Sequence, residues 1–153
     1  MTTQLTVSAG VLVAAEQERV WDLAVDWAQQ ERWVLATKSE GGHGAGARVV
    51  GRTGFGPVSF TDPMLITHWD PPNRCVVAHE GKVVRGTGLF EVVPRTATQA
   101  EFRWTERVEI PLPHALGKLL AVALIGPVTR VGLGWSLRRF ARLVTARQRE
   151  IRP

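Results

Sequence analysis

The sequence predicts an α+β domain in which a curved antiparallel sheet wraps around one long C-terminal helix. Two observations support this prediction. Between residues 47 and 110, segments with strand character are separated by short turn signals. After residue 114, apolar residues follow a helical period instead. Strands joined by short turns pair antiparallel as a meander, and one helix across such a sheet gives an α+β arrangement.

Length and composition indicate one domain over residues 1–153. The chain has 153 residues, of which 44% are hydrophobic and 22% charged, which excludes a largely disordered chain. The single cysteine, Cys75, excludes an internal disulfide and any multi-cysteine metal site. No uncharged apolar run reaches the ~18 residues of a membrane span, and the N-terminus does not resemble a signal peptide. We therefore expect a cytoplasmic protein.

The first elements are a short strand and two short helices. Leu5, Val7 and Ala9 alternate with polar residues, as in a strand. From residue 16 to residue 33 the apolar residues recur every three to four positions, which is typical of a helix. We expect this segment to divide into two helices near Asp26.

The middle of the chain predicts five strands. A glycine-rich stretch over residues 41–46 precedes them and is typical of a connecting loop. It is not a phosphate-binding loop, because the Gly-Lys-Ser/Thr sequence that such loops require does not follow it. Pro111 and Pro113 are expected to end the last strand. The expected strands are Ala47–Thr53, Val58–Trp69, Arg74–His79, Val83–Val93 and Ala100–Ile110.

The last element is a long helix from about His114 to Arg149. Gly126-Pro127 should kink it, because proline lacks a backbone donor and clashes with the preceding turn. A curved sheet wrapped around this helix would leave a cavity between the two. Beyond the kink an apolar stripe is formed by Leu133, Leu137, Phe140 and Val144.

Positive charge is concentrated at the C-terminal end. Residues 130–153 contain seven arginines and one acidic residue, whereas residues 1–129 carry a net charge of −1. The arginines could form a solvated helix face, contact an anionic membrane or nucleic acid, or bind a partner protein. No recognition module or interleaved aromatics favour nucleic acid, so we expect none. Weak contact with an anionic surface would involve Arg138, Arg139 and Arg142.

Four segments resemble a known superfamily. They are Glu18–Leu23 with Asp26 and Trp33, Asp70–Arg74, Gly86–Val92, and Leu137–Phe140. Together they resemble SRPBCC proteins, also called START-like or polyketide cyclase/dehydrase-like proteins, over nearly the whole chain. The resemblance implies a helix-grip fold around a hydrophobic ligand pocket. Members include lipid carriers, aromatic polyketide cyclases, quinone-binding proteins and co-chaperone-like domains, so the fold does not settle the function.

Strand alternation places two carboxylates on apolar faces. Glu106 shares a face with Phe102 and Trp104, and Asp62 shares one with Met64. A buried carboxylate is costly unless it is paired. Glu106 could be a general acid/base, a polar anchor for a ligand, a structural partner of a buried arginine, or a rim residue near solvent. Asp62 could have a functional role, or could stabilise a bulge or cap a turn. A bulge at Asp62-Pro63 would reverse the faces of that strand.

Three further features bear on the site. His79 ends its strand and could act as acid, base or donor at a pocket mouth, or be a surface residue. Gly86 and Gly88 lie on the inner face, where they could open cavity volume or, as we favour, bend the sheet. No His/Glu spacing indicates a metal site, and no cofactor is expected.

The sequence thus predicts a protein that binds a hydrophobic small molecule such as a lipid, a polyketide or another aromatic compound. One alternative is a polyketide cyclase/dehydratase-type enzyme that uses Glu106 or Asp62 as acid/base. Another is a protein-interaction or co-chaperone-like domain. The expected ligand-binding residues are Asp62, Met64, His79, Phe90, Phe102, Trp104, Glu106 and Trp135.

Overall fold

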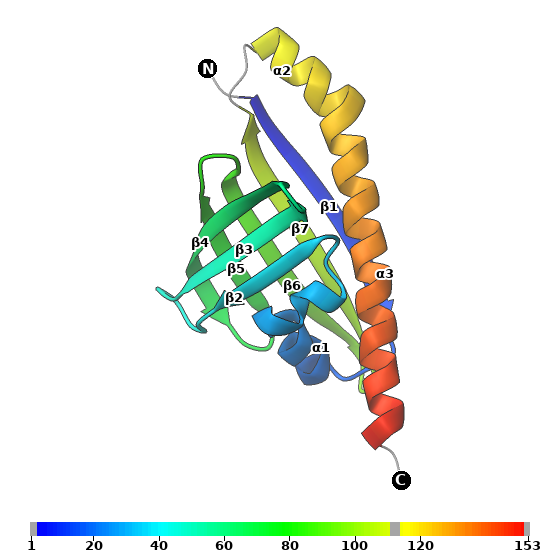
Figure 1. The fold of residues 1–153 in the computed structure, drawn as a ribbon. Helices are drawn as coiled ribbons and strands as arrows, with labels where there is room; N and C mark the ends of the chain where they lie inside the picture. The colour runs from blue at the N-terminus through cyan, green and yellow to red at the C-terminus, as the bar shows by residue number, and fades with distance from the viewer. Residues whose placement is uncertain (1–2, 111–113, 152–153) are drawn as a thin grey trace.

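A computed structural model of the chain describes residues 3–110 and 114–151. Its centre is a seven-stranded antiparallel sheet with the strand order β1-β7-β6-β5-β4-β3-β2 (Figure 1). The strands are β1 (Thr3–Val13), β2 (Thr37–Gly41), β3 (Arg48–Phe55), β4 (Val58–Asp70), β5 (Arg74–Glu80), β6 (Arg85–Thr96) and β7 (Gln99–Ile110). The helices are α1 (Gln17–Ala24), the 3-10 helix η1 (Trp27–Arg32), α2 (His114–Leu120), the π-helical turn η2 (Ala121–Ile125) and α3 (Gly126–Ile151).

The five predicted strands are confirmed as the meander β3 to β7, and two differences appear at the N-terminal side. β1 is longer than predicted, because its alternation continues to Val13 and every residue pairs with β7. β2 was not predicted at all. Its sequence is Thr-Lys-Ser-Glu-Gly, which has no apolar alternation, and pairing with β3 makes it a strand. The strand end expected at Pro111 and Pro113 lies outside the described residues.

β4 keeps a regular register through the site. Asp62 pairs with Gly51 and Pro63 with Val50, so the bulge considered at Asp62-Pro63 is absent from this described strand. The register shift lies further along, between Ile66 and His68. Asp62 and Met64 therefore share one face, as the alternation predicted.

The helices follow the prediction closely. Two short helices, α1 and η1, come after β1. The C-terminal helical segment runs from His114 to Ile151, and the π-helical turn η2 directly precedes Gly126-Pro127. This irregularity lies where a kink was expected, because Pro127 cannot donate a backbone hydrogen bond.

The core is formed where the second half of α3 meets the sheet. Phe140 is fully buried, with its ring centroid 4.5 Å from that of Phe102 on β7 and 4.9 Å from that of Trp33. Leu137 and Val144 continue this buried stripe. By length and composition, the helix Lys118–Ile151 is apolar enough to cross a membrane, a test that core helices of soluble proteins also pass.

Candidate ligand-binding cavity

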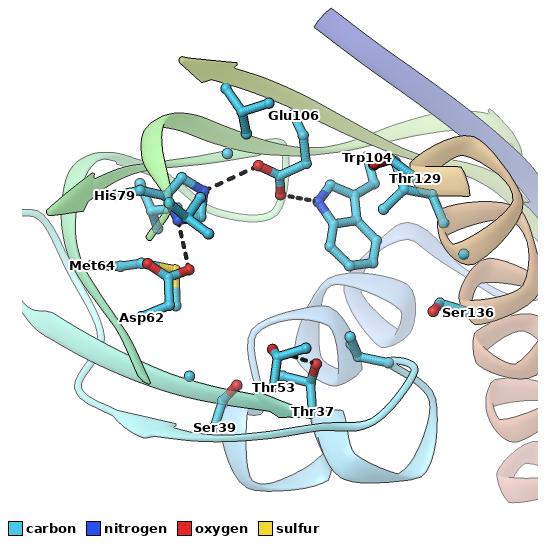
Figure 2. A pocket seen from close by; sticks show the side chains of 18 of the residues that line it. Thr37, Ser39, Thr53, Asp62, Met64, His79, Trp104, Glu106, Thr129 and Ser136 are labelled. Atoms are coloured by element: carbon cyan, nitrogen blue, oxygen red, sulfur yellow. Dashed lines mark hydrogen bonds and ion pairs between the residues drawn. The ribbon is translucent and has the colours of Figure 1, made fainter. Parts of the chain in front are cut away.

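A cavity of about 590 Å³ lies between the sheet and residues 125–136 of the C-terminal helix (Figure 2). Its walls come from β2 to β7, η1, and the first turns of α3. Most of the lining is apolar, including Met64, Val77, Phe90, Trp104 and Leu133. This is the position where the sequence predicted a cavity.

One wall of the cavity carries a hydrogen-bonded group that we call the His79 cluster: Asp62, His79, Trp104 and Glu106 (Figure 2). Nδ1 of His79 lies 2.7 Å from Oδ2 of Asp62, and Nε2 lies 3.0 Å from Oε2 of Glu106. The indole Nε1 of Trp104 donates to Oε1 of Glu106 over 2.5 Å. The four side chains thus form one chain of hydrogen bonds within an apolar cavity.

The strand register explains why these residues meet. Asp62 is on β4, His79 on β5, and Glu106 on β7, so β6 lies between the last two. In register with Glu106, β6 has Gly88. A Cβ at Gly88 would lie 3.2 Å from both Nε2 of His79 and Oε1 of Glu106. Because Gly88 has no side chain, His79 and Glu106 have room to meet across β6. We had favoured a role for this glycine in bending the sheet, and had not predicted this one.

The cluster fixes the charge of the imidazole. Burial by itself lowers the pKa of His79, but hydrogen bonds to Asp62 and Glu106 and the charges of both carboxylates raise it to about 10. At neutral pH His79 is therefore an imidazolium that donates one N–H to each carboxylate.

The facing wall carries several uncharged polar side chains (Figure 2). Thr37 and Thr53 share a hydrogen bond of 2.9 Å between their Oγ1 atoms. Ser39 Oγ is buried and has no hydrogen-bond partner among the described residues. On the helix, Ser136 Oγ accepts from the backbone N–H of Leu35 over 3.0 Å.

Sequence reasoning missed this second wall. Thr37 and Ser39 lie on β2, the strand that was not predicted. Ser136 had a usable signal, because it is a polar residue beside Leu137 on the apolar stripe of the helix.

Six of the eight predicted ligand-binding residues line the cavity, and two lie elsewhere. Phe102 is fully buried behind the wall, where Phe140 of α3 covers β7 directly. Trp135 lies under the guanidinium of Arg139, whose Cζ is 4.6 Å from the ring centroid. The six lining residues are Asp62, Met64, His79, Phe90, Trp104 and Glu106.

Cys75 also lines the cavity, but burial makes it a poor nucleophile. The side chain is 2% exposed, and desolvation raises the pKa of its thiol to about 12. Within residues 3–110 and 114–151 no group of three His, Cys, Asp or Glu side chains is arranged to hold a metal ion. The chemistry of the cavity therefore rests on the His79 cluster.

Several solved structures share this fold. The Zhui aromatase/cyclase from Streptomyces sp. R1128 is 16% identical with a TM-score of 0.74, over 95% of this chain and 96% of that one. TTHA0849 from Thermus thermophilus is 20% identical with a TM-score of 0.73, over 92% and 97%. Norcoclaurine synthase from Thalictrum flavum is 15% identical with a TM-score of 0.66, over 97% and 98%. These likenesses confirm the helix-grip fold.

The sequence itself identifies the family. No curated protein matches the chain at a significant level of similarity. Residues 4–145, however, match the family model described as polyketide cyclase / dehydrase and lipid transport. The match spans nearly all of the sequence and agrees with the resemblance to SRPBCC proteins. The chain belongs to the polyketide cyclase/dehydrase and lipid transport family.

Proposed function

We propose that this protein binds a hydrophobic small molecule in the cavity. The observation that carries the proposal is the cavity of about 590 Å³, which is mostly apolar and has few converging polar groups. Ligand sites typically have volumes of about 300–1,000 Å³ and this same mixture of surfaces. Membership of the family supports a role in ligand binding or in polyketide cyclisation.

The His79 cluster indicates how the ligand is oriented. Each oxygen of Glu106 accepts one hydrogen bond within the cluster and keeps a further acceptor site. A hydroxyl or amine of the ligand can donate to Glu106 while its apolar body contacts Phe90 and Val77. Because the free sites of Glu106 are acceptors, a donor group of the ligand fits this wall and an acceptor-only anionic group does not.

Gly132 and Gly134 on α3 offer a matched test of the cavity. Gly132 lines the cavity, and a Cβ there would meet only Cδ2 of Leu35, at 3.9 Å. A Cβ at Gly134 would have no heavy atom within 4 Å, and Gly134 does not line the cavity. Gly132→Phe should therefore place its ring at the cavity, whereas Gly134→Phe should leave the cavity open.

The measurement is titration of each variant with Nile red, a neutral dye whose fluorescence rises in apolar surroundings. We expect Gly132→Phe to weaken binding by about tenfold or more, which is about 1.4 kcal/mol. Gly134→Phe should bind like the wild type. Equal affinity in all three proteins, or no binding to the native wild type, would show that the cavity is not the site. Independently of the dye titration, native mass spectrometry of the purified wild type would identify any lipophile that co-purifies with it.

A polyketide cyclase/dehydratase-type activity is the second candidate. The favouring observation is an imidazolium held between two carboxylates inside the cavity. In this role Glu106 or Asp62 would transfer protons. We rank it second because both N–H groups of His79 are already donated to carboxylates, which leaves the imidazolium no N–H to give to a substrate. A protein-interaction role ranks third, since it requires no cavity.

A further inference from the structure

The first half of the C-terminal helical segment presents an apolar surface to solvent. Five large apolar side chains recur along one side of α2, η2 and the start of α3, each between 49% and 70% exposed. Monomeric proteins rarely leave contiguous apolar surface of this kind without a use. We call this surface the apolar stripe, and it consists of Leu116, Leu119, Leu124, Val128 and Val131.

The apolar stripe reaches the mouth of the cavity. Val128 is 62% exposed and also lines the cavity, so it lies at the rim. Val83, between β5 and β6, and Leu35, before β2, are likewise exposed, at 63% and 44%, and line the cavity. Three separate segments thus contribute exposed apolar side chains to one rim.

The charged side chains of this helical segment are all basic, although the exposed Glu109 of β7 also lines the cavity. Residues 114–149 contain seven basic side chains and no acidic one. Lys118 and Arg130, both exposed, lie within the length of the stripe. An apolar helix face flanked by basic residues is the pattern of helices that lie in the interface of an anionic membrane.

We propose that the apolar stripe docks this protein on an anionic lipid surface, with the mouth of the cavity facing the bilayer. Lys118 and Arg130 contact the lipid headgroups, and the stripe enters the outer part of the acyl region. A second copy of the chain fits less well, because a symmetric contact would bring this basic face against itself. Docking does not depend on the proposed function, although exchange of a ligand with the bilayer does.

The first test compares vesicles of phosphatidylcholine alone with vesicles of phosphatidylcholine and phosphatidylglycerol in equal amounts. The wild type should sediment with the anionic vesicles, and added salt should release it. Leu119→Gln/Leu124→Gln/Val131→Gln removes exposed side chains that do not line the cavity. This variant should lose vesicle binding by more than about tenfold and keep Nile red binding, which verifies its fold.

The second test removes charge. Lys118→Gln/Arg130→Gln should weaken binding to the anionic vesicles by about fivefold for each charge. Arg19→Gln/Arg74→Gln is the matched control and should bind normally. Arg19 is on α1, which lies at the opposite end of the molecule from α2 (Figure 1). Arg74 follows the turn that Gln17 of α1 contacts through Asn73.

The third test reports orientation. A polarity-sensitive fluorophore on Val83→Cys should shift to the blue with anionic vesicles, whereas the same label on Arg19→Cys should not. The native Cys75 is buried and does not compete for the label.

Three outcomes would overturn the proposal: no binding of the wild type to anionic vesicles, equal loss in the control pair, or concentration-dependent dimers that depend on the stripe without vesicle binding. Nile red binding would survive each of these outcomes, so the proposed function would still stand.

Discussion

His79 joins carboxylates from two strands that are not neighbours in the sheet. Its two nitrogens contact Asp62 on β4 and Glu106 on β7. Without the imidazolium, two partly buried carboxylates would share one mostly apolar wall with no positive partner. The positive charge of His79 therefore stabilises both acidic groups on this wall.

Stability should depend on pH through His79. Its pKa is about 10 in the folded protein and about 6.5 in an unfolded chain. The contribution of His79 to the free energy of unfolding is fully present below pH 6.5 and is lost as pH rises through 10. The free energy of unfolding should fall by at most about 1.4 kcal/mol per pH unit in this range. Urea denaturation at a series of pH values measures it. His79→Gln should flatten the dependence below about pH 8, above which the Cys75 thiol of the unfolded chain also titrates. His68→Gln, at an exposed site, should retain it. A wild-type profile that is flat between pH 6.5 and 10 would contradict this prediction.

Glu106→Gln should separate anchoring from catalysis. The amide preserves the shape of the side chain but cannot balance the charge of His79. For an anchoring role we expect a retained fold and a loss of about 1–3 kcal/mol in the free energy of unfolding. Urea denaturation and Nile red titration of the purified variant measure these effects. Turnover of an aromatic or polyketide-like substrate by the wild type, abolished in a stably folded Glu106→Gln variant, would favour the enzyme instead.

Single residues show where sequence reasoning succeeds. Alternation placed Asp62 and Glu106 on inward faces because the residues two positions away on either side are apolar. The contact between them was not predictable, because His79 lies 17 positions from Asp62 and 27 from Glu106. Only the register of four strands brings these three residues together.

At the scale of elements, β6 depends on two glycines with different roles. Gly88 leaves room for the His79 cluster. Gly86 has a φ of +129°, and a Cβ there would overlap the carbonyl oxygen of Arg107 on the neighbouring strand. β6 can therefore approach β7 at this point only because Gly86 has no side chain.

Gly86→Ala should therefore lower the free energy of unfolding by more than the unfavourable positive φ alone would. We expect a loss of at least about 3 kcal/mol, because strain and overlap with Arg107 combine. Gly46→Ala is the control: its φ is +86°, but no heavy atom lies within 4 Å of the added Cβ. It should lose only about 1–2 kcal/mol. Thermal and urea unfolding of both variants would decide, and similar losses would contradict the role given to Arg107.

The elements also show the limits of periodicity. The meander from β3 to β7 was predictable because each strand alternates and each turn has its own signal. β2 was not, since its five residues include no large apolar side chain. Its pairing with β3 comes from tertiary context, and two polar residues of the cavity lining, Thr37 and Ser39, were missed with it.

At the scale of the whole molecule, one helical segment serves two environments. Its second half packs into the core through Leu137, Phe140 and Val144. Its first half lies beside the cavity and presents the apolar stripe to solvent. The cavity thus lies beside the first turns of α3, and the packed core lies beneath its second half.

Phe140 should be a major link between the helix and the rest of the fold. It is fully buried against Trp33 and Phe102, which come from separate parts of the chain. Phe140→Ala should lower the free energy of unfolding by about 3–5 kcal/mol. Phe55→Ala, at a site that is 74% exposed, should change it by less than about 0.5 kcal/mol. Chemical denaturation measures the free energy of unfolding of both variants. A small loss for Phe140→Ala would contradict the prediction that Phe140 is a major contact between the helix and the sheet.

The pairing of β1 has a consequence for synthesis on the ribosome. Each strand from β3 to β7 can pair with its predecessor as it emerges, but β1 pairs with β7, and Thr3 meets Ile110. At about 5–20 residues per second, β1 waits roughly 5–20 s for its partner to be translated. During that interval its backbone donors and acceptors are open to other nascent chains. The last strand pairing to become available in this sheet is thus made by β1, the earliest of its strands to be translated.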